Sequence, residues 1–137
     1  MFKIELDYIR TVKKMYKKYN PNPRGNEHAG DCVIRAIAKA MGKTWETAFV
    51  ELSLAGFFSG DWGNSNNVWD HYLTDHHFKR YICPTCTTVA EFANSHKGGT
   101  YILGTGTHAV AVIDGAYFDS WDSGQEMPIY FYTKEVL

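Results

Sequence analysis

The chain has 137 residues, the size of one ordinary domain, and 45% of them are apolar and 15% aromatic. This composition can bury a hydrophobic core, and it excludes a disordered tail, a collagen-like or low-complexity polymer and a coiled coil. The formal net charge is −1, which gives no overall attraction to nucleic acid or to an anionic membrane surface. We therefore expect one domain over residues 1–137, with no nucleic-acid partner.

The cysteine content and the N-terminal stretch predict a cytoplasmic protein. Residues 1–18 alternate apolar and charged side chains and contain neither the apolar region nor the cleavage site of a signal peptide. No run of eighteen apolar residues occurs, so we expect no membrane partner. The three cysteines (Cys32, Cys83 and Cys86) are too few for a secreted disulfide framework.

Helical patterns dominate the chain up to residue 97. Apolar residues at near-helical spacing predict a basic helix over residues 3–19, and an Asn- and Pro-rich loop follows over 20–26. A second helix is predicted from residue 31 or 32 to 41, where Gly42 stops it. A third helix is predicted over 45–55, with Thr44 as N-cap and Gly56 as the closing residue. Residues 1–24 are thus assigned to a basic helix and loop, and residues 26–97 to a mainly helical region.

Strand patterns dominate the last third of the chain. Before it, we expect a polar loop over 59–67, a short helix over 68–73, a short strand over 78–82 and a helix from the capping box at 88–91 to about 95. Four strand-like runs then follow, at 100–103, 108–113, 117–121 and 129–132. Helices first and strands later, with short connections, predict an α+β fold with an antiparallel sheet over 100–137.

Cys32 lies where a nucleophilic cysteine is favoured. It follows Gly30 and Asp31 and begins the apolar second helix, so its sulfur is expected at the N-terminus of that helix. The free N–H groups and the helix dipole at this end stabilise an anion, and the thiolate is an anion. A small apolar residue at the start of a buried helix is the alternative role for this cysteine.

His108 opens a strongly apolar strand directly after a Gly-Thr-Gly-Thr loop, where a rigid scaffold can present a general base. The register of the following hairpin decides which carboxylate orients its ring. If Asp114 and Gly115 form a two-residue loop, Asp119 is the diagonal neighbour of His108 on the same face. A three-residue loop reverses every face and brings Asp122 opposite His108 instead.

This arrangement resembles the papain-like cysteine peptidases. In that family the nucleophile begins the central helix, a histidine begins a later strand, and Asn or Asp lies on the next strand. Residues 108–112 are similar to the family's histidine strand, and residues 119–121 (Asp-Ser-Trp) resemble its Asn-Ser-Trp segment, which favours Asp119 over Asp122. The resemblance covers roughly residues 26–41 and 100–124. Small phage-encoded proteins predicted to have this fold look similar over more of the chain, which suggests a phage origin.

The resemblance implies a single papain-like domain with a Cys32–His108–Asp119 triad that hydrolyses peptide, isopeptide or other amide bonds through a thioacyl-enzyme. It also implies that Asn26, six residues before the cysteine, supplies an oxyanion-hole side chain. The chain departs from the family pattern because Asn26 stands in place of Gln, Asp119 in place of Asn, and Val33 in place of an aromatic residue. We expect a peptide or protein substrate and no cofactor.

A non-enzymatic reading uses other residues. Cys83 and Cys86 form a C-x-x-C pair which, with His77 and His96, has the composition of a Cys₂His₂ zinc set. The chain would then be a zinc-binding or catalytically inactive papain-like interaction module. Such a module would contact its partner through the basic N-terminal helix and exposed aromatic residues (Phe57, Phe58, Trp62 and Trp69).

Overall fold

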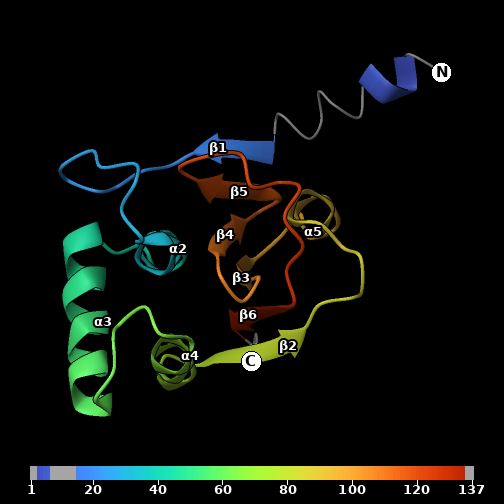
Figure 1. The fold of residues 1–137 in the computed structure, drawn as a ribbon. Coiled ribbons are helices and arrows are strands. Elements are labelled where there is room, and N and C mark those ends of the chain that lie inside the picture. Colours follow the sequence, from blue (N-terminus) through green and yellow to red (C-terminus); the bar gives the residue numbers. More distant parts are fainter. Residues whose placement is uncertain (1–2, 7–14, 135–137) are drawn as a thin grey trace.

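The computed structural model describes residues 3–6 and 15–134. In this part of the chain, one six-stranded mixed sheet has helices on both faces (Figure 1), and the predicted α+β class is compatible with this arrangement. The elements in chain order are β1 (Tyr16–Lys18), α2 (Cys32–Met41), α3 (Trp45–Ser59), α4 (Asn66–Asp75), β2 (Phe78–Ile82), α5 (Val89–Ser95), β3 (Thr100–Gly104), β4 (Ala109–Ile113), β5 (Ala116–Asp119) and β6 (Tyr130–Lys134). Residues 3–6 are helical. Within the described ranges, none of the helices has the length and apolar character that a bilayer crossing requires.

The sheet has the strand order β1-β5-β4-β3-β6-β2, and β4 and β3 lie at its centre. All neighbouring strands are antiparallel except β1 and β5, which are parallel. The four predicted C-terminal strands are present, and two strands from earlier in the chain join them: the predicted β2, and β1, whose parallel pairing with β5 makes the sheet mixed. The antiparallel sheet expected from residues 100–137 alone is thus an incomplete description.

Two hydrophobic layers enclose the central strands because successive side chains of a strand point to opposite faces. Ala109 and Ala111 of β4 face the layer built by α2, α3 and α4. Val110 and Val112 face the second layer, which α5 covers from the other side of the sheet (Figure 1). Since β4 is buried on both faces, its N-terminal end is held in a fixed place relative to α2.

The predicted helix over 3–19 is wrong at its C-terminal end, where Tyr16–Lys18 forms the strand β1. Residues 7–14 of that prediction lie outside the described ranges. The Tyr16 ring packs on that of Tyr117 with centroids 5.6 Å apart, and the Tyr19 N–H donates to the Asp119 carbonyl at 2.8 Å. Pairing with the open edge of β5 therefore outweighs the local helical pattern of this Lys-rich segment.

The third predicted helix is longer than expected. It continues through Gly56 to Ser59, and Gly60, with a φ of 71°, is its C-cap. Gly56 serves close packing instead, because a Cβ there would lie 2.5 Å from the Asp61 carbonyl oxygen. The predictions of α2 with its stop at Gly42, of β2, and of α5 behind the Thr88 cap are confirmed.

Candidate active site

Cys32 is the first residue of α2, and its side chain is partly buried. Figure 1 shows α2 lying across the middle of the sheet, where it packs against β3, β4 and β5. The thiol therefore lies at the positive end of a helix whose position is set by the core. The carboxylate of the preceding Asp31 is bound by Arg35 and by the Trp45 indole N–H at 2.9 Å, so it does not occupy the free N–H groups of the helix.

His108 is held by the tight loop that precedes β4. Its backbone N–H donates to Thr105 Oγ1 at 3.0 Å, and its carbonyl accepts from the Thr105 N–H at 2.9 Å. The φ of 99° at Gly106 is a conformation that side-chain-bearing residues rarely adopt. The Asn66 amide of α4 donates to the Gly106 carbonyl at 3.2 Å, which fixes the loop from the helical side. The histidine is thus presented by a rigid turn.

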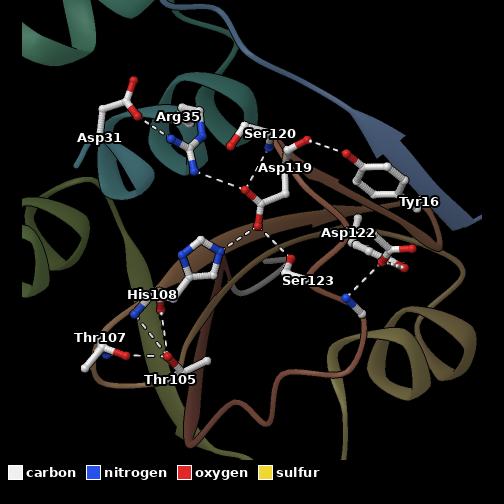
Figure 2. A network of polar contacts seen from close by, with 12 residues as sticks. Tyr16, Asp31, Arg35, Thr105, Thr107, His108, Asp119, Ser120, Asp122 and Ser123 are labelled. Carbon is white, nitrogen blue, oxygen red and sulfur yellow. Dashed lines mark hydrogen bonds and ion pairs between the residues drawn. The ribbon is translucent and has the colours of Figure 1, made fainter. Parts of the chain in front are cut away.

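The hairpin between β4 and β5 has the two-residue register, since Ile113 pairs with Ala116 around Asp114 and Gly115. Both turn residues have positive φ, at 50° and 83°, as a tight hairpin loop of this kind needs. Asp119 is therefore on the same face as His108. The distance from its Oδ2 to His108 Nε2 is 2.6 Å, and the carboxylate is 1% exposed (Figure 2).

Asp122, the other carboxylate considered for this role, has a different function in the structure. Its Oδ1 accepts from the Tyr117 hydroxyl and from the Gly124 N–H at 3.0 Å. These bonds hold the loop after β5 and close it over Tyr117. The geometry thus pairs His108 with Asp119 rather than with Asp122.

The Asp119 carboxylate is surrounded by donors. Its Oδ2 accepts from Ser123 Oγ at 2.6 Å, and its Oδ1 accepts from the Ser120 N–H at 2.8 Å and from Arg35 Nη2 at 3.0 Å. Burial raises the pKa of Asp119, but the hydrogen bonds from His108 and Ser123 and the charges of His108 and Arg35 outweigh it. The net result is a pKa below the ordinary value, which keeps Asp119 ionised beside the imidazole.

Cys32 and His108 have pKa values displaced in opposite directions. Burial raises the pKa of the Cys32 thiol, but hydrogen bonds with the His108 side chain and the Ala109 backbone, and the charges of His108 and Arg35, lower it further than burial raises it. Burial also lowers the pKa of His108, but its hydrogen bonds to Asp119 and Cys32 raise it to about 9. This pattern favours a thiolate next to an imidazolium.

Arg35 is a site residue that the sequence reasoning missed. It follows Cys32 by one helical turn, it is buried, and its guanidinium bridges Asp31 and Asp119 (Figure 2). The sequence did contain a signal for this role: Arg35 is a basic residue within a largely apolar helix and follows Asp31 by four residues, the spacing of an ion pair on one helix face. The bridge ties the helix that bears the nucleophile directly to the carboxylate of the sheet.

A pocket of about 240 Å³ opens at Cys32 and His108. Asn64 and Asn66 line it, whereas Asn26, which the family resemblance placed in an oxyanion hole, does not. Asn26 is exposed, and its Oδ1 accepts from the His28 N–H at 2.9 Å within the loop before α2. The structure thus places the Asn26 side chain in a local turn of this loop, outside the pocket. Asn66 is bonded to Gly106 and Trp69, whereas Asn64 is the second amide side chain in the lining of this pocket.

The alternative zinc set is not assembled. Among residues 3–6 and 15–134, no three His, Cys, Asp or Glu side chains are placed to hold a metal ion. Cys83 is buried and Cys86 is exposed, and the His96 ring stacks on Phe92 with centroids 3.8 Å apart. The surface expected for an interaction module is also smaller, because Trp69 is 2% exposed and belongs to the core.

These positions were compared with what is known of other proteins. Neither a protein-family model, nor a curated protein, nor a solved structure matches the chain. The resemblance to papain-like peptidases therefore stays an expectation.

Proposed function

We propose that this chain is a cysteine-nucleophile hydrolase of amide bonds, with a papain-like arrangement of one helix packed on a sheet. Cys32 is the nucleophile, His108 the general acid and base, and Asp119 the residue that orients the imidazole. The observation that carries the proposal is the position of His108 between Cys32 and Asp119, with its Nε2 bound to the carboxylate. Figure 2 shows the other ring nitrogen on the side away from Asp119, and a hydrogen bond with the His108 side chain lowers the pKa of the Cys32 thiol.

The reaction follows from these positions. The Cys32 thiolate attacks the carbonyl carbon, a C–S bond forms, and the carbonyl electron pair moves to oxygen. The oxyanion is stabilised by the backbone N–H of Cys32 at the N-terminus of α2, and Asn64 is the nearby amide side chain. His108 gives its proton to the leaving amine as the C–N bond breaks. Water, deprotonated by His108, then hydrolyses the thioester.

The pH dependence of Cys32 alkylation by iodoacetamide, read by peptide mass spectrometry, tests this proposal. Cys83 and Cys86 in the same molecule are internal controls. Cys32 is expected to react rapidly well below the ordinary thiol pKa of about 8.5. In His108→Ala the rate at pH 6 is expected to fall about a hundredfold, because the thiolate loses its cationic partner. Slow labelling of wild-type Cys32, similar to that of Cys83, would contradict an activated nucleophile.

A catalytically inactive interaction module is the second candidate, and one observation favours it. The outer surface of α3 and the loop after it expose large apolar side chains, among them Phe57, Phe58 and Trp62 at 76%, 82% and 80%. Substitution of the nucleophile separates the two functions. A binding module retains partner binding in Cys32→Ala and has no hydrolytic activity to lose.

A further inference from the structure

A second pocket of about 360 Å³ lies beside the pocket of Cys32, and Gly30 and Asn64 border both. It extends from the loop before α2 to one side of α3 and the loop that follows α3. A Cβ added to Gly30 would meet no atom within 4 Å, so the backbone at this shared residue faces open space. The second pocket is therefore the neighbouring hollow for a chain bound at the nucleophile.

Aromatic rings form much of the wall of this second pocket. Trp45 and Phe49 stack with ring centroids 5.0 Å apart, and Phe49 is 43% exposed. Trp62 stands at the rim and is 80% exposed. Binding of an apolar group over these exposed rings is favourable, because it removes apolar surface from water. The volume and the lining are those of a site for an apolar group.

The loop that bears Trp62 is held firmly against α3. The Asp61 N–H donates to the Gly56 carbonyl at 2.9 Å, and the Asp61 carboxylate accepts from the Trp62 N–H at 2.7 Å and from the Ser65 hydroxyl at 2.9 Å. A Cβ on Gly63 would lie 2.8 Å from the Leu52 carbonyl oxygen, so loop and helix meet backbone to backbone. The indole is thus presented by a preformed wall, which lowers the entropy that binding must overcome.

The charges around the pocket favour a neutral occupant. Asp31 is the charged residue of its lining, and its carboxylate is already bound by Arg35 and by the Trp45 indole. The other polar side chains of the lining are neutral. A charged group would lose its hydration here without gaining an opposite charge.

We propose that the second pocket is the subsite that receives an aromatic or branched aliphatic side chain of a peptide substrate, next to the amide that Cys32 attacks. The inference rests on the proposed hydrolase function and adds the class of substrate to it. Binding energy gained in this pocket holds the scissile carbonyl against the thiolate.

Two alkylating probes test this subsite, N-acetyl-phenylalanyl and N-acetyl-glycyl chloromethyl ketone, in which the Cys32 thiolate displaces chloride. Their second-order rate constants are measured by mass spectrometry, and the ratio is expected to favour the phenylalanyl probe roughly tenfold or more. Trp62→Ala is expected to reduce the ratio to a few-fold. Phe58→Ala is the matched control, since it removes an aromatic ring of similar exposure outside the pocket and should keep the wild-type ratio. Any change in thiolate reactivity cancels within the ratio.

The outcomes separate the subsite from the proposed function. A ratio near one together with rapid iodoacetamide labelling of Cys32 overturns the subsite alone, as does an equal loss of preference in Trp62→Ala and Phe58→Ala. Slow iodoacetamide labelling overturns the hydrolase. The pocket is then tested directly in Cys32→Ala by titration with N-acetyl-phenylalaninamide, followed by NMR of the Trp62 indole N–H. A saturable shift supports an apolar binding pocket, and an unchanged resonance overturns it.

Discussion

Two cysteines of this chain lie in shielded places and are driven in opposite directions by their surroundings. Cys83, after β2, packs among apolar residues, and burial raises its pKa to about 11. Cys32 is also partly buried, but a helix N-terminus, His108 and Arg35 surround it, and its pKa falls below the ordinary value. Burial alone makes a thiol inert, and burial beside positive charge makes it a nucleophile.

Replacement of each cysteine by alanine is expected to give the largest difference in hydrolytic rate between the two regions. Cys32→Ala is expected to reduce amide hydrolysis by about 10⁴-fold or more, because no other group of the site replaces the thiolate. Cys83→Ala is expected to retain the hydrolytic rate, since Cys83 packs in the layer covered by α5. The measurement is turnover of fluorogenic peptide amides, with circular dichroism as the control for folding. Equal losses in both variants would contradict the contrast.

Asp119 at the end of β5 and Asp122 in the loop after it provide the next test. Asp119→Ala is expected to lower the hydrolytic rate by about 10²- to 10⁴-fold, because His108 loses the partner of its Nε2. Asp122→Ala is the matched control, and its rate should stay within a few-fold of wild type because Asp122 bonds to Tyr117 and Gly124. Both rates are measured under conditions in which circular dichroism shows folded protein. The reverse order of effects would exclude the observed pairing.

Substitution of Arg35 tests whether this residue stabilises the fold alone or also controls the reactivity of Cys32. Arg35→Met removes the buried cation that Asp31 and Asp119 share, and the free energy of unfolding is expected to fall by about 3–5 kcal/mol. Arg35→Lys restores one charge and is expected to recover part of this loss. Urea unfolding measures stability, and the pH profile of Cys32 alkylation in folded protein measures the role at the site. If the Met and Lys variants gave the wild-type profile, Arg35 would serve the fold alone.

Changing the pH titrates Cys32 and His108 reversibly, and its effect on the rate of hydrolysis is expected to be smaller than that of the substitutions. The rate should rise with pH through the lowered pKa of Cys32 as the thiolate forms. It should then fall by about tenfold per pH unit above the His108 pKa of about 9, because deprotonated His108 has no proton for the leaving amine. Initial rates between pH 4 and 11 measure both limbs. An alkaline limb near pH 6.5 would mean that Asp119 does not stabilise the imidazolium.

The parts of the site that local rules govern were predicted from the sequence. Gly42 ends α2 in a left-handed conformation, and the Asp114–Gly115 turn sets the register that brings Asp119 to His108. Both follow from the conformations that a few neighbouring residues prefer. The sequence alone leaves the register open between a two-residue and a three-residue loop, and Asp119 is favoured over Asp122 because residues 119–121 resemble the family's Asn-Ser-Trp segment.

The errors occur where distant segments decide the outcome. Tyr16–Lys18 is a strand because the edge of β5 is available to it, and Gly56 lies inside α3 because the following loop needs close approach. The position of Asn64 beside Cys32 depends on that loop, and the burial of Arg35 depends on Asp119. Apart from the contact of Gly56 with Asp61, five residues later, these contacts join segments far apart in the sequence.

The strand β1 has a consequence for the order in which the protein becomes reactive. Tyr16 donates a hydrogen bond to the Asp119 carbonyl, 103 residues away in sequence. Asp119 belongs to the last third of the chain, yet it is held by a strand from the first third. Synthesis delivers Cys32 long before His108 and Asp119 leave the ribosome. The nascent thiol has no imidazole beside it during that interval, and we expect it to react no faster than a free cysteine. If Cys32 is the nucleophile that we propose, its activation waits until β4 and β5 are translated.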